Sequence, residues 1–171
     1  GQKLGFSGTL AGEKSQASIS FTEPYFLDRD IAAGFDAYHI IRNLQSSSSY
    51  DSKKTGFGLR AGYSLSRELR QSLRYKIESA RIENVSVSAS NLIKAQTGSR
   101  FLSQVGQKLS YSTLDSRINP KDGYRLQMTN DIAGLGGNIR YIRNTVKAVQ
   151  YHELFKSWVF AFKGETGHIL G

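Results

Sequence analysis

Apolar and polar residues alternate along most of this chain, in segments of about ten residues with turn residues between them. The clearest segment, 57–65, carries Phe, Leu, Ala, Tyr and Leu at its odd positions and Gly, Arg, Gly and Ser at its even positions. Because successive side chains of a strand point to opposite faces, each segment has one apolar and one polar face. This pattern is typical of an antiparallel transmembrane β-barrel.

The period predicts nine strands, over residues 3–11, 15–23, 31–42, 54–65, 68–83, 98–113, 123–133, 139–152 and 157–169. The connections alternate in length: 43–53 and 84–97 are long and polar, whereas 27–30, 65–68 and 153–156 are short. Outer-membrane barrels have short periplasmic turns and longer extracellular loops, so we expect the short connections on the periplasmic side. Single-chain bacterial barrels have even strand numbers, so nine strands predict part of a larger barrel.

Composition narrows the class of protein. Hydrophobic residues make up 39% of the 171 residues, and the longest pure apolar runs are short, such as 158–162. A membrane-spanning helix needs roughly 18 apolar residues or more, so a helix-bundle membrane protein is excluded. Periodicity alone leaves a soluble β-sandwich open, because its strands alternate as well. Long strands, and glycines and serines among the charges of the polar face, favour the membrane barrel.

The net charge is +9, and there are no cysteines, which removes disulfides, thiolate metal sites and thiol nucleophiles. The cations fall on alternate strand positions without a compact basic run, which argues against nucleic-acid binding. We expect the charged residues of the polar face to point into a lumen; they are Arg60, Arg70, Arg74, Arg125, Arg143, Lys147, Lys163, Glu78 and Glu165. Pairing with acids such as Asp36 and Asp131 is the favoured interpretation, and a screen for anions is the alternative.

Candidate catalytic chemistry is weak. The histidines, His39, His152 and His168, lie on different predicted strands and are expected at rims rather than in a metal site. Glu78 and Glu165 lie on distant strands, which is poor evidence for a hydrolase. No serine stands in a nucleophile elbow. We therefore expect a protein that is not an enzyme and that uses no metal or other cofactor.

Aromatic residues gather near the presumed periplasmic ends of the strands, where an interfacial girdle is expected in a membrane barrel. Besides Tyr25 and Phe26, the predicted girdle consists of Tyr111, Tyr124, Tyr151, Phe155 and Trp158.

Two motifs are more specific than the apolar–polar alternation that any barrel strand shows. The first is Glu23-Pro24-Tyr25-Phe26, in which Pro24 removes a ladder donor and so ends a strand. The second runs from Asp115 to Tyr124 and contains Asn119, Pro120 and Gly123. Pro120 presets φ and Gly123 permits a left-handed residue, which predicts a turn, and Asp115 could accept hydrogen bonds from its amides.

At these residues the chain resembles the barrel of the BamA family, the outer-membrane protein assembly factors of Gram-negative bacteria. That family shows a strand ending in an acidic or Asn residue followed by Pro-Tyr-Phe. About ninety residues later it has a periplasmic turn of the form Asp, a few residues, Pro, two residues, Gly, as in this chain. The resemblance covers Leu4 to about Gly164, and implies the third to eleventh strands of a sixteen-strand barrel.

The resemblance implies a non-enzymatic insertase in the outer membrane that uses no nucleotide or metal. Its partners would be outer-membrane lipid, unfolded outer-membrane protein clients and the accessory lipoproteins of an assembly complex, with no nucleic acid. The family's Arg-Gly-Phe motif, its periplasmic POTRA repeats, its first strand and its final strand are missing from residues 1–171, and residues 1–5 do not form a signal peptide. We therefore expect a partial barrel that supplies wall rather than gate.

Three alternatives stay open at this point. The first is the translocation-and-assembly relative that serves autotransporters. The second is a passive anion-preferring porin, in which the lumen cations set the selectivity. The third is a soluble β-sandwich that binds a ligand.

Overall fold

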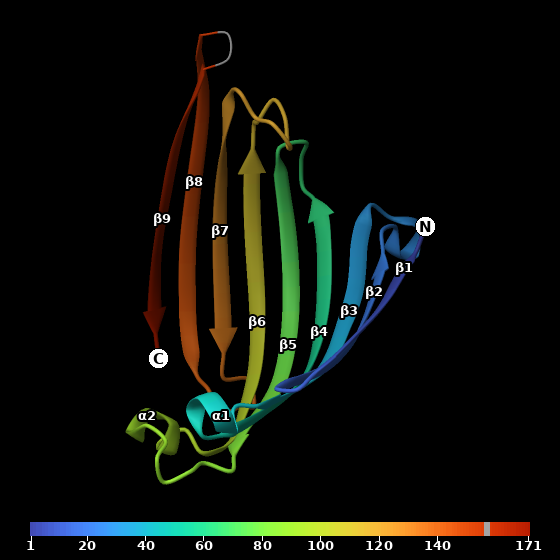
Figure 1. Cartoon of the computed structure of the whole chain (residues 1–171). Helices are drawn as coiled ribbons and strands as arrows, with labels where there is room; N and C mark the ends of the chain where they lie inside the picture. Colours follow the sequence, from blue (N-terminus) through green and yellow to red (C-terminus); the bar gives the residue numbers. More distant parts are fainter. Residues whose placement is uncertain (156–157) are drawn as a thin grey trace.

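A computed structural model describes residues 1–155 and 158–171 as one nine-stranded antiparallel sheet, in which each strand pairs with the next along the chain (Figure 1). The strands are β1 Lys3–Ala11, β2 Lys14–Glu23, β3 Ile31–Asn43, β4 Asp51–Ser64, β5 Leu69–Glu83, β6 Gly98–Ser112, β7 Gly123–Ala133, β8 Tyr141–Phe155 and β9 Trp158–Leu170. The connections contain the short helices η1 Phe26–Asp28, α1 Gln45–Ser48 and α2 Asn91–Lys94. The all-β antiparallel prediction is confirmed.

Two strand boundaries differ from the prediction by three residues. Strand β4 begins at Asp51 because residues 51–53 pair with β3 and β5 on both sides, although they are polar. Strand β8 continues to Phe155, which pairs with Trp158, so residues 153–155 are strand rather than connection. The rest of the predicted connection 153–156, and residue 157 of the predicted ninth strand, lie outside the described residues. Among the described residues, no helix is long and apolar enough to cross a membrane.

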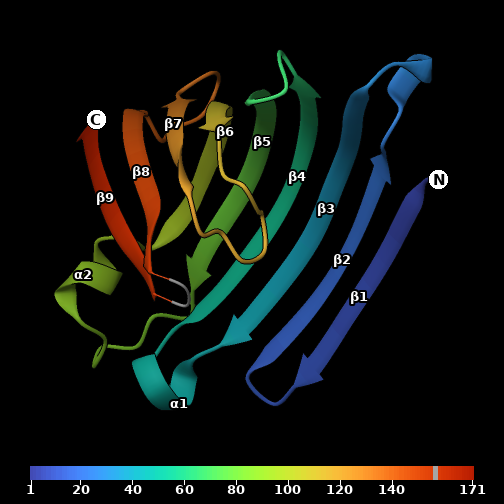
Figure 2. The same cartoon turned by 90° about the horizontal axis from the view of Figure 1, so that it is seen from above.

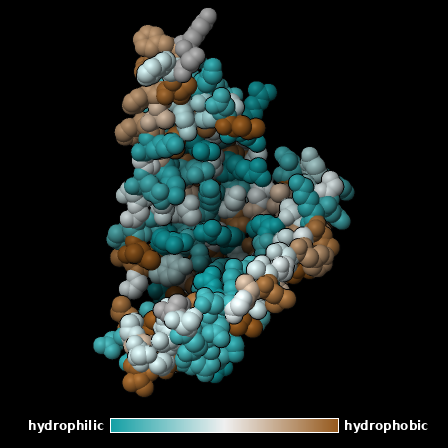
Figure 3. Space-filling model, in the orientation of Figure 1, coloured by the Kyte–Doolittle hydropathy of each residue, from teal (hydrophilic) through white to brown (hydrophobic). Residues whose placement is uncertain are grey.

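The strand register gives the sheet one apolar and one polar face. We call residues that lie side by side across neighbouring strands a row. One row of the apolar face is Phe21, Phe35, Leu59, Tyr75 and Val105, and one row of the polar face is Gly34, Arg60, Arg74, Gly106, Asp131 and Arg143. The rings of Phe21 and Phe35 stack with centroids 5.7 Å apart. Figure 3 shows hydrophilic side chains gathered over β5 to β8, and hydrophobic ones along β1 to β3.

The sheet is curved (Figure 2), and contacts between its side chains identify the polar face as the concave one. Side chains on this face converge across an intervening strand: Arg74 of β5 reaches Asp131 of β7, and Tyr141 of β8 reaches Gln104 of β6. On the apolar face the aromatic contacts join neighbouring strands only within the described residues. A closed barrel made by continuing this curvature would therefore have the polar face inside.

Burial separates this sheet from a soluble sandwich. A sandwich buries the apolar faces of two sheets against each other. Here the fully buried side chains are polar, Asp131 and Ser103, whereas Phe6 and Phe162 of the apolar face remain 74% and 63% exposed. The described chain forms a single layer, so its apolar face needs a solvent other than water.

Candidate functional site

The strand register places all nine predicted lumen charges on the polar face. Arg60 and Arg74 are neighbours across β4 and β5, and Lys147 faces Glu165 across β8 and β9. Acidic partners hold four of the cations, in the pairs Arg60–Asp36, Arg74–Asp131, Arg143–Asp131 and Lys147–Glu165. Within the described part of the chain, Arg70, Arg125 and Lys163 have no acidic partner at ion-pair distance.

Asp131 is the centre of the strongest charge cluster on this face. Its side chain is fully buried, and its carboxylate accepts hydrogen bonds from Nη2 of Arg74 at 2.5 Å and from Nη2 and Nε of Arg143 at 2.6 and 3.1 Å. A buried carboxylate between two guanidinium groups is satisfied in both charge and hydrogen bonding. The cluster ties β5, β7 and β8 together.

The Arg74–Asp131 bond passes over a glycine of the intervening strand. A Cβ atom at Gly106 would lie 2.5 Å from Nε of Arg74 and 2.6 Å from Oδ1 of Asp131. Only a residue without a side chain leaves the room that this bond needs. We call such an arrangement a clasp: a side chain that crosses a glycine to bond two strands away.

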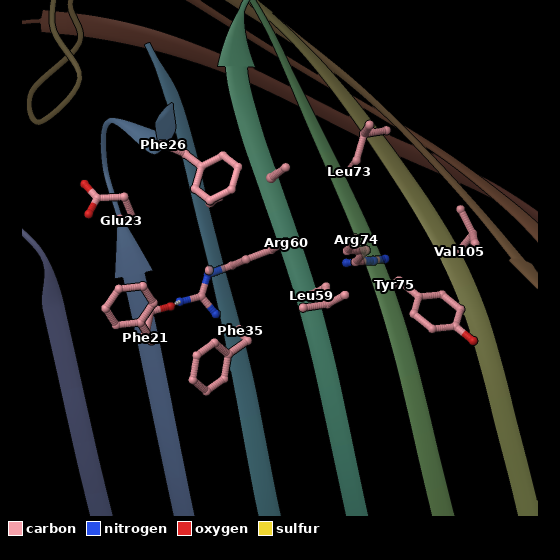
Figure 4. A pocket seen from close by; sticks show the side chains of 13 residues that line it. Phe21, Glu23, Phe26, Phe35, Leu59, Arg60, Leu73, Arg74, Tyr75 and Val105 are labelled. Carbon is pink, nitrogen blue, oxygen red and sulfur yellow. Dashed lines mark hydrogen bonds between the residues drawn. The ribbon is translucent and has the colours of Figure 1, made fainter. Parts of the chain in front are cut away.

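Two further clasps follow the same plan. Arg60 of β4 passes over Gly34 of β3 and donates to Oγ1 of Thr22 at 2.6 Å and to the carbonyl oxygen of Phe21 at 3.2 Å (Figure 4). Tyr38 of β3 passes over Gly56 of β4 and donates to Glu78 of β5. The three clasps bridge β2–β4, β3–β5 and β5–β7, so they stiffen the wall and fix its curvature.

The first motif lies where β2 ends. Oε1 of Glu23 accepts a hydrogen bond from the amide of Tyr25 at 3.2 Å, and Pro24 follows the last paired residue, as predicted. Tyr25 and Phe26 both stay exposed, and Phe26 lines, together with Phe21, a hollow of about 530 Å³ on the apolar side of the sheet (Figure 4). The motif therefore turns the chain and adds aromatic surface at this rim.

The second motif forms a loop around one carboxylate. Oδ1 of Asp115 accepts from the amides of Ser116, Lys121 and Asp122 at 2.9, 3.0 and 3.2 Å, which confirms the predicted role of this side chain. The hydrogen bond from the Lys121 amide, with that from Asp122, lowers the pKa of Asp115. Gly123 follows with φ of 98°, which a side chain would strain.

The remaining motif residues, Asn119 and Pro120, lie within this loop. The amide of Asn119 donates to Oγ of Ser116 at 3.2 Å.

The structure distributes the residues of the predicted girdle over both faces of the sheet. The rings of Tyr111 and Tyr124 lie 5.8 Å apart on the apolar face, and Phe155 and Trp158 are each 73% exposed. Tyr151 differs, because its pairing with Gly123 places it on the same face as Lys147. The alternation of side chains assigns Tyr151 to the polar face, whatever its position along the strand.

The apolar face carries a polar row that the sequence analysis above does not predict. It runs across β6 to β9 and consists of Gln107, Asn130, Asn144 and His168. Nδ2 of Asn130 donates to Oδ1 of Asn144 at 2.6 Å. The two asparagines stand at apolar positions of their segments, which is the signal that would have found the row.

The histidines stay apart. His39 contacts Oγ1 of Thr55 at 2.7 Å, His152 lies 3.3 Å from Asp122, and His168 ends the polar row. Among the described residues, no three potential metal-ligating His, Asp or Glu side chains gather in one place.

A family model described as an Omp85 superfamily domain matches residues 1–171. The chain belongs to the Omp85 superfamily. The proteins of this superfamily that it resembles are outer-membrane proteins, which places this Omp85 chain in the bacterial outer membrane. Since the concave face is polar, the apolar face is the one that meets lipid.

Two curated relatives carry the name outer membrane protein assembly factor BamA. The protein of Neorickettsia risticii is 29% identical over 92% of this Omp85 chain, and that of Nitratidesulfovibrio vulgaris is 24% identical over 94%. The chain spans about a fifth of the length of each relative, 21% and 20%. A crystal structure of BamA from Haemophilus ducreyi lacking POTRA domains 1–3 matches 99% of the chain with a TM-score of 0.77 at 18% identity, and the match covers 35% of that structure.

Proposed function

We propose that this chain forms part of the wall of an outer-membrane insertase, which folds other β-barrel proteins and inserts them into the bacterial outer membrane. One observation carries the proposal: both curated relatives that match more than nine-tenths of the chain are named outer membrane protein assembly factor BamA. Because the chain spans about a fifth of their length, the proposal assigns it a share of the barrel wall rather than the whole activity.

In this proposal the wall segment keeps the curvature of the barrel fixed. The clasps over Gly34, Gly56 and Gly106 each join two strands that have one strand between them. The Asp131 cluster also joins β8 to the two strands of the Gly106 clasp. A wall fixed in this way keeps its curvature while a client folds beside it. The exposed apolar face sets how the barrel sits in the bilayer, since an apolar band about 25 Å tall matches the hydrocarbon region.

No covalent chemistry is needed for this function, and the proposed protein is not an enzyme and uses no cofactor. The free energy of a client barrel falls when its apolar band leaves water and when its last strands complete their hydrogen bonds. The insertase lowers the barrier to that process. Its proposed partners are outer-membrane lipid, unfolded barrel clients and the accessory lipoproteins of an assembly complex.

One observation favours a second candidate, a passive anion-preferring channel. Arg70, Arg125 and Lys163 face the concave side without an acidic partner among the described residues. Cations that line a pore attract anions and speed their passage. The distribution of these cations fits either a channel or a binding surface, so the two candidates need a functional test.

Depletion of the gene in the native bacterium separates the candidates. An insertase predicts that the folded forms of many outer-membrane barrels fall together, measured by their heat-dependent migration in gels, and that the native gene restores them. A channel predicts unchanged levels of folded barrels and slower uptake of small anions. Unchanged barrel levels after full depletion would therefore overturn the proposed function.

A further inference from the structure

A basic hollow lies on the concave face, where β4, β5 and β6 run side by side. Its volume is about 340 Å³, within the range of small-ligand sites. Four cationic residues line it, namely Arg60, Arg70, Arg74 and Lys108. No acidic residue is among the described residues that line it. Two small residues, Gly62 and Ser72, lie between the cations, whereas the Arg74–Asp131 bond covers a third, Gly106.

The cations of the hollow outnumber the carboxylates that pair with them. Arg60 and Arg74 bind Asp36 and Asp131, but the carboxylate of Asp131 is shared with the guanidinium of Arg143. Arg70 and Lys108 are exposed and have no acidic partner within the described part of the chain. Arg70 and Lys108 therefore give the hollow an excess of positive charge, to which Arg74 adds because it shares the carboxylate of Asp131 with Arg143.

The cations follow a regular spacing along the strands. Arg70, Ser72 and Arg74 alternate on the concave face of β5, and Lys108 of β6 lies beside Ser72. Residues two apart in a strand are separated by about 6.8 Å, so the three cationic positions fall at intervals of about 7 Å over about 14 Å. An extended peptide presents its same-face side chains with this same interval. A single phosphate group is too small to meet all three.

We propose that this hollow binds an extended acidic peptide segment whose carboxylates stand at alternate positions. The segment lies along the wall strands, and its carboxylates meet Arg74, Lys108 and Arg70 in turn. The guanidinium groups donate to a carboxylate in a two-pronged geometry, and the lysine supplies a point charge between them. This site needs only an accessible lumen and does not depend on insertase activity.

Two fluorescein-labelled peptides of equal composition and charge test the spacing. In the first, Glu-Gln-Glu-Gln-Glu, all three carboxylates stand on one side of an extended chain. In the second, Glu-Glu-Glu-Gln-Gln, one carboxylate points away. Binding is measured by fluorescence anisotropy to the full-length protein that contains this chain, in detergent micelles. The proposal expects the alternating peptide to bind at least about fivefold more tightly, because it uses one more charged contact.

Two matched double variants test the location. Arg70→Gln with Lys108→Gln removes two cations of the hollow that have no acidic partner, and Arg125→Gln with Lys163→Gln removes two such cations from elsewhere on the same face. We expect the first pair to weaken binding of the alternating peptide about tenfold or more, and the second pair to change it less than about twofold. Heat-dependent gel migration checks that both variants are folded.

Three results would overturn the site. Equal losses in the two double variants would mean general attraction to a cationic lumen. Equal binding of the two peptides would refute the spacing. Full displacement of the alternating peptide by millimolar inorganic phosphate would point to a small-anion site instead. None of these results bears on the depletion test of the proposed function.

Discussion

The clasp over Gly106 gives the sharpest stability prediction. Gly106→Ala places a methyl group where Nε of Arg74 and Oδ1 of Asp131 now lie, at 2.5 and 2.6 Å. The Arg74 side chain must move away, and its hydrogen bond to Asp131 is broken or lengthened. Gly58→Ala is the matched control, because Gly58 is also a mid-strand glycine of the polar face, yet its Cβ would meet only the carbonyl oxygen of Tyr75, at 3.6 Å.

Gly106→Ala should lower the free energy of unfolding, whereas Gly58→Ala should leave it unchanged or raise it. Loss of one charged hydrogen bond costs about 1.5–3 kcal/mol. Replacing glycine by alanine returns about 0.4–1 kcal/mol, because the unfolded chain loses conformational freedom. Arg74 is half exposed and regains hydration, so the lower part of the range applies. We expect Gly106→Ala to destabilise by about 0.5–2 kcal/mol and Gly58→Ala to be neutral or stabilising by up to about 1 kcal/mol.

Urea unfolding of the full-length protein in liposomes measures both changes under one set of conditions. A midpoint shift is a change in stability when the slope of the transition stays constant. Combination with Arg74→Gln adds a second check, because most of the Gly106→Ala penalty should vanish once the guanidinium is gone. If Gly106→Ala and Gly58→Ala unfold at the same urea concentration, the clasp contributes nothing and the reasoning is refuted.

Two further predictions concern the loop and the lipid face. The lowered pKa of Asp115 means that the order it gives the loop is fully present above its ordinary value of 3.8, and is lost as the pH falls through the lowered value. Hydrogen exchange of the loop amides, corrected for the effect of pH on the intrinsic exchange rate, should show this loss of protection. Asp115→Asn should lose the protection already at neutral pH, whereas Asp122→Asn should keep it. Equal protection in both variants would contradict the role of Asp115. In the polar row, Asn130→Leu alone should destabilise the protein in liposomes by about 1 kcal/mol, because Asn144 loses its partner, while replacing both asparagines by leucine should be neutral or stabilising. A double variant less stable than either single one would show that the row is held by more than this pair.

Much of the wall could be predicted because alternation is a local signal. The segment 57–65 has all its apolar residues on one parity, and the structure keeps that parity through β4. The same rule placed Arg70, Arg125 and Lys163 on one face without knowledge of the register. The turn at Asp115 was equally readable, since its acceptor, its proline and its glycine lie within nine residues of one another.

The rest depended on register between strands, which alternation does not supply. Arg74 and Asp131 are 57 residues apart, and they meet only because Gly106 lies between them in the same row. The predicted pairing of cations with acids was therefore right in kind, but the clasps were not foreseen. Nearness to a strand end predicts Tyr151 in the aromatic girdle, but its position in the alternation places it on the polar face. Asn130 was passed over because its neighbours at the same parity are apolar.

Reconstitution tests the central claim most directly. The full-length protein that contains this chain is placed in liposomes, an unfolded second barrel protein is added, and its insertion is followed alongside the ion conductance of the membrane. The wall of an insertase predicts insertion that is faster than into empty liposomes, with small or erratic conductance. Insertion no faster than into empty liposomes, with steady anion-selective conductance, would contradict the account and make the unpaired lumen cations the functional residues of a channel.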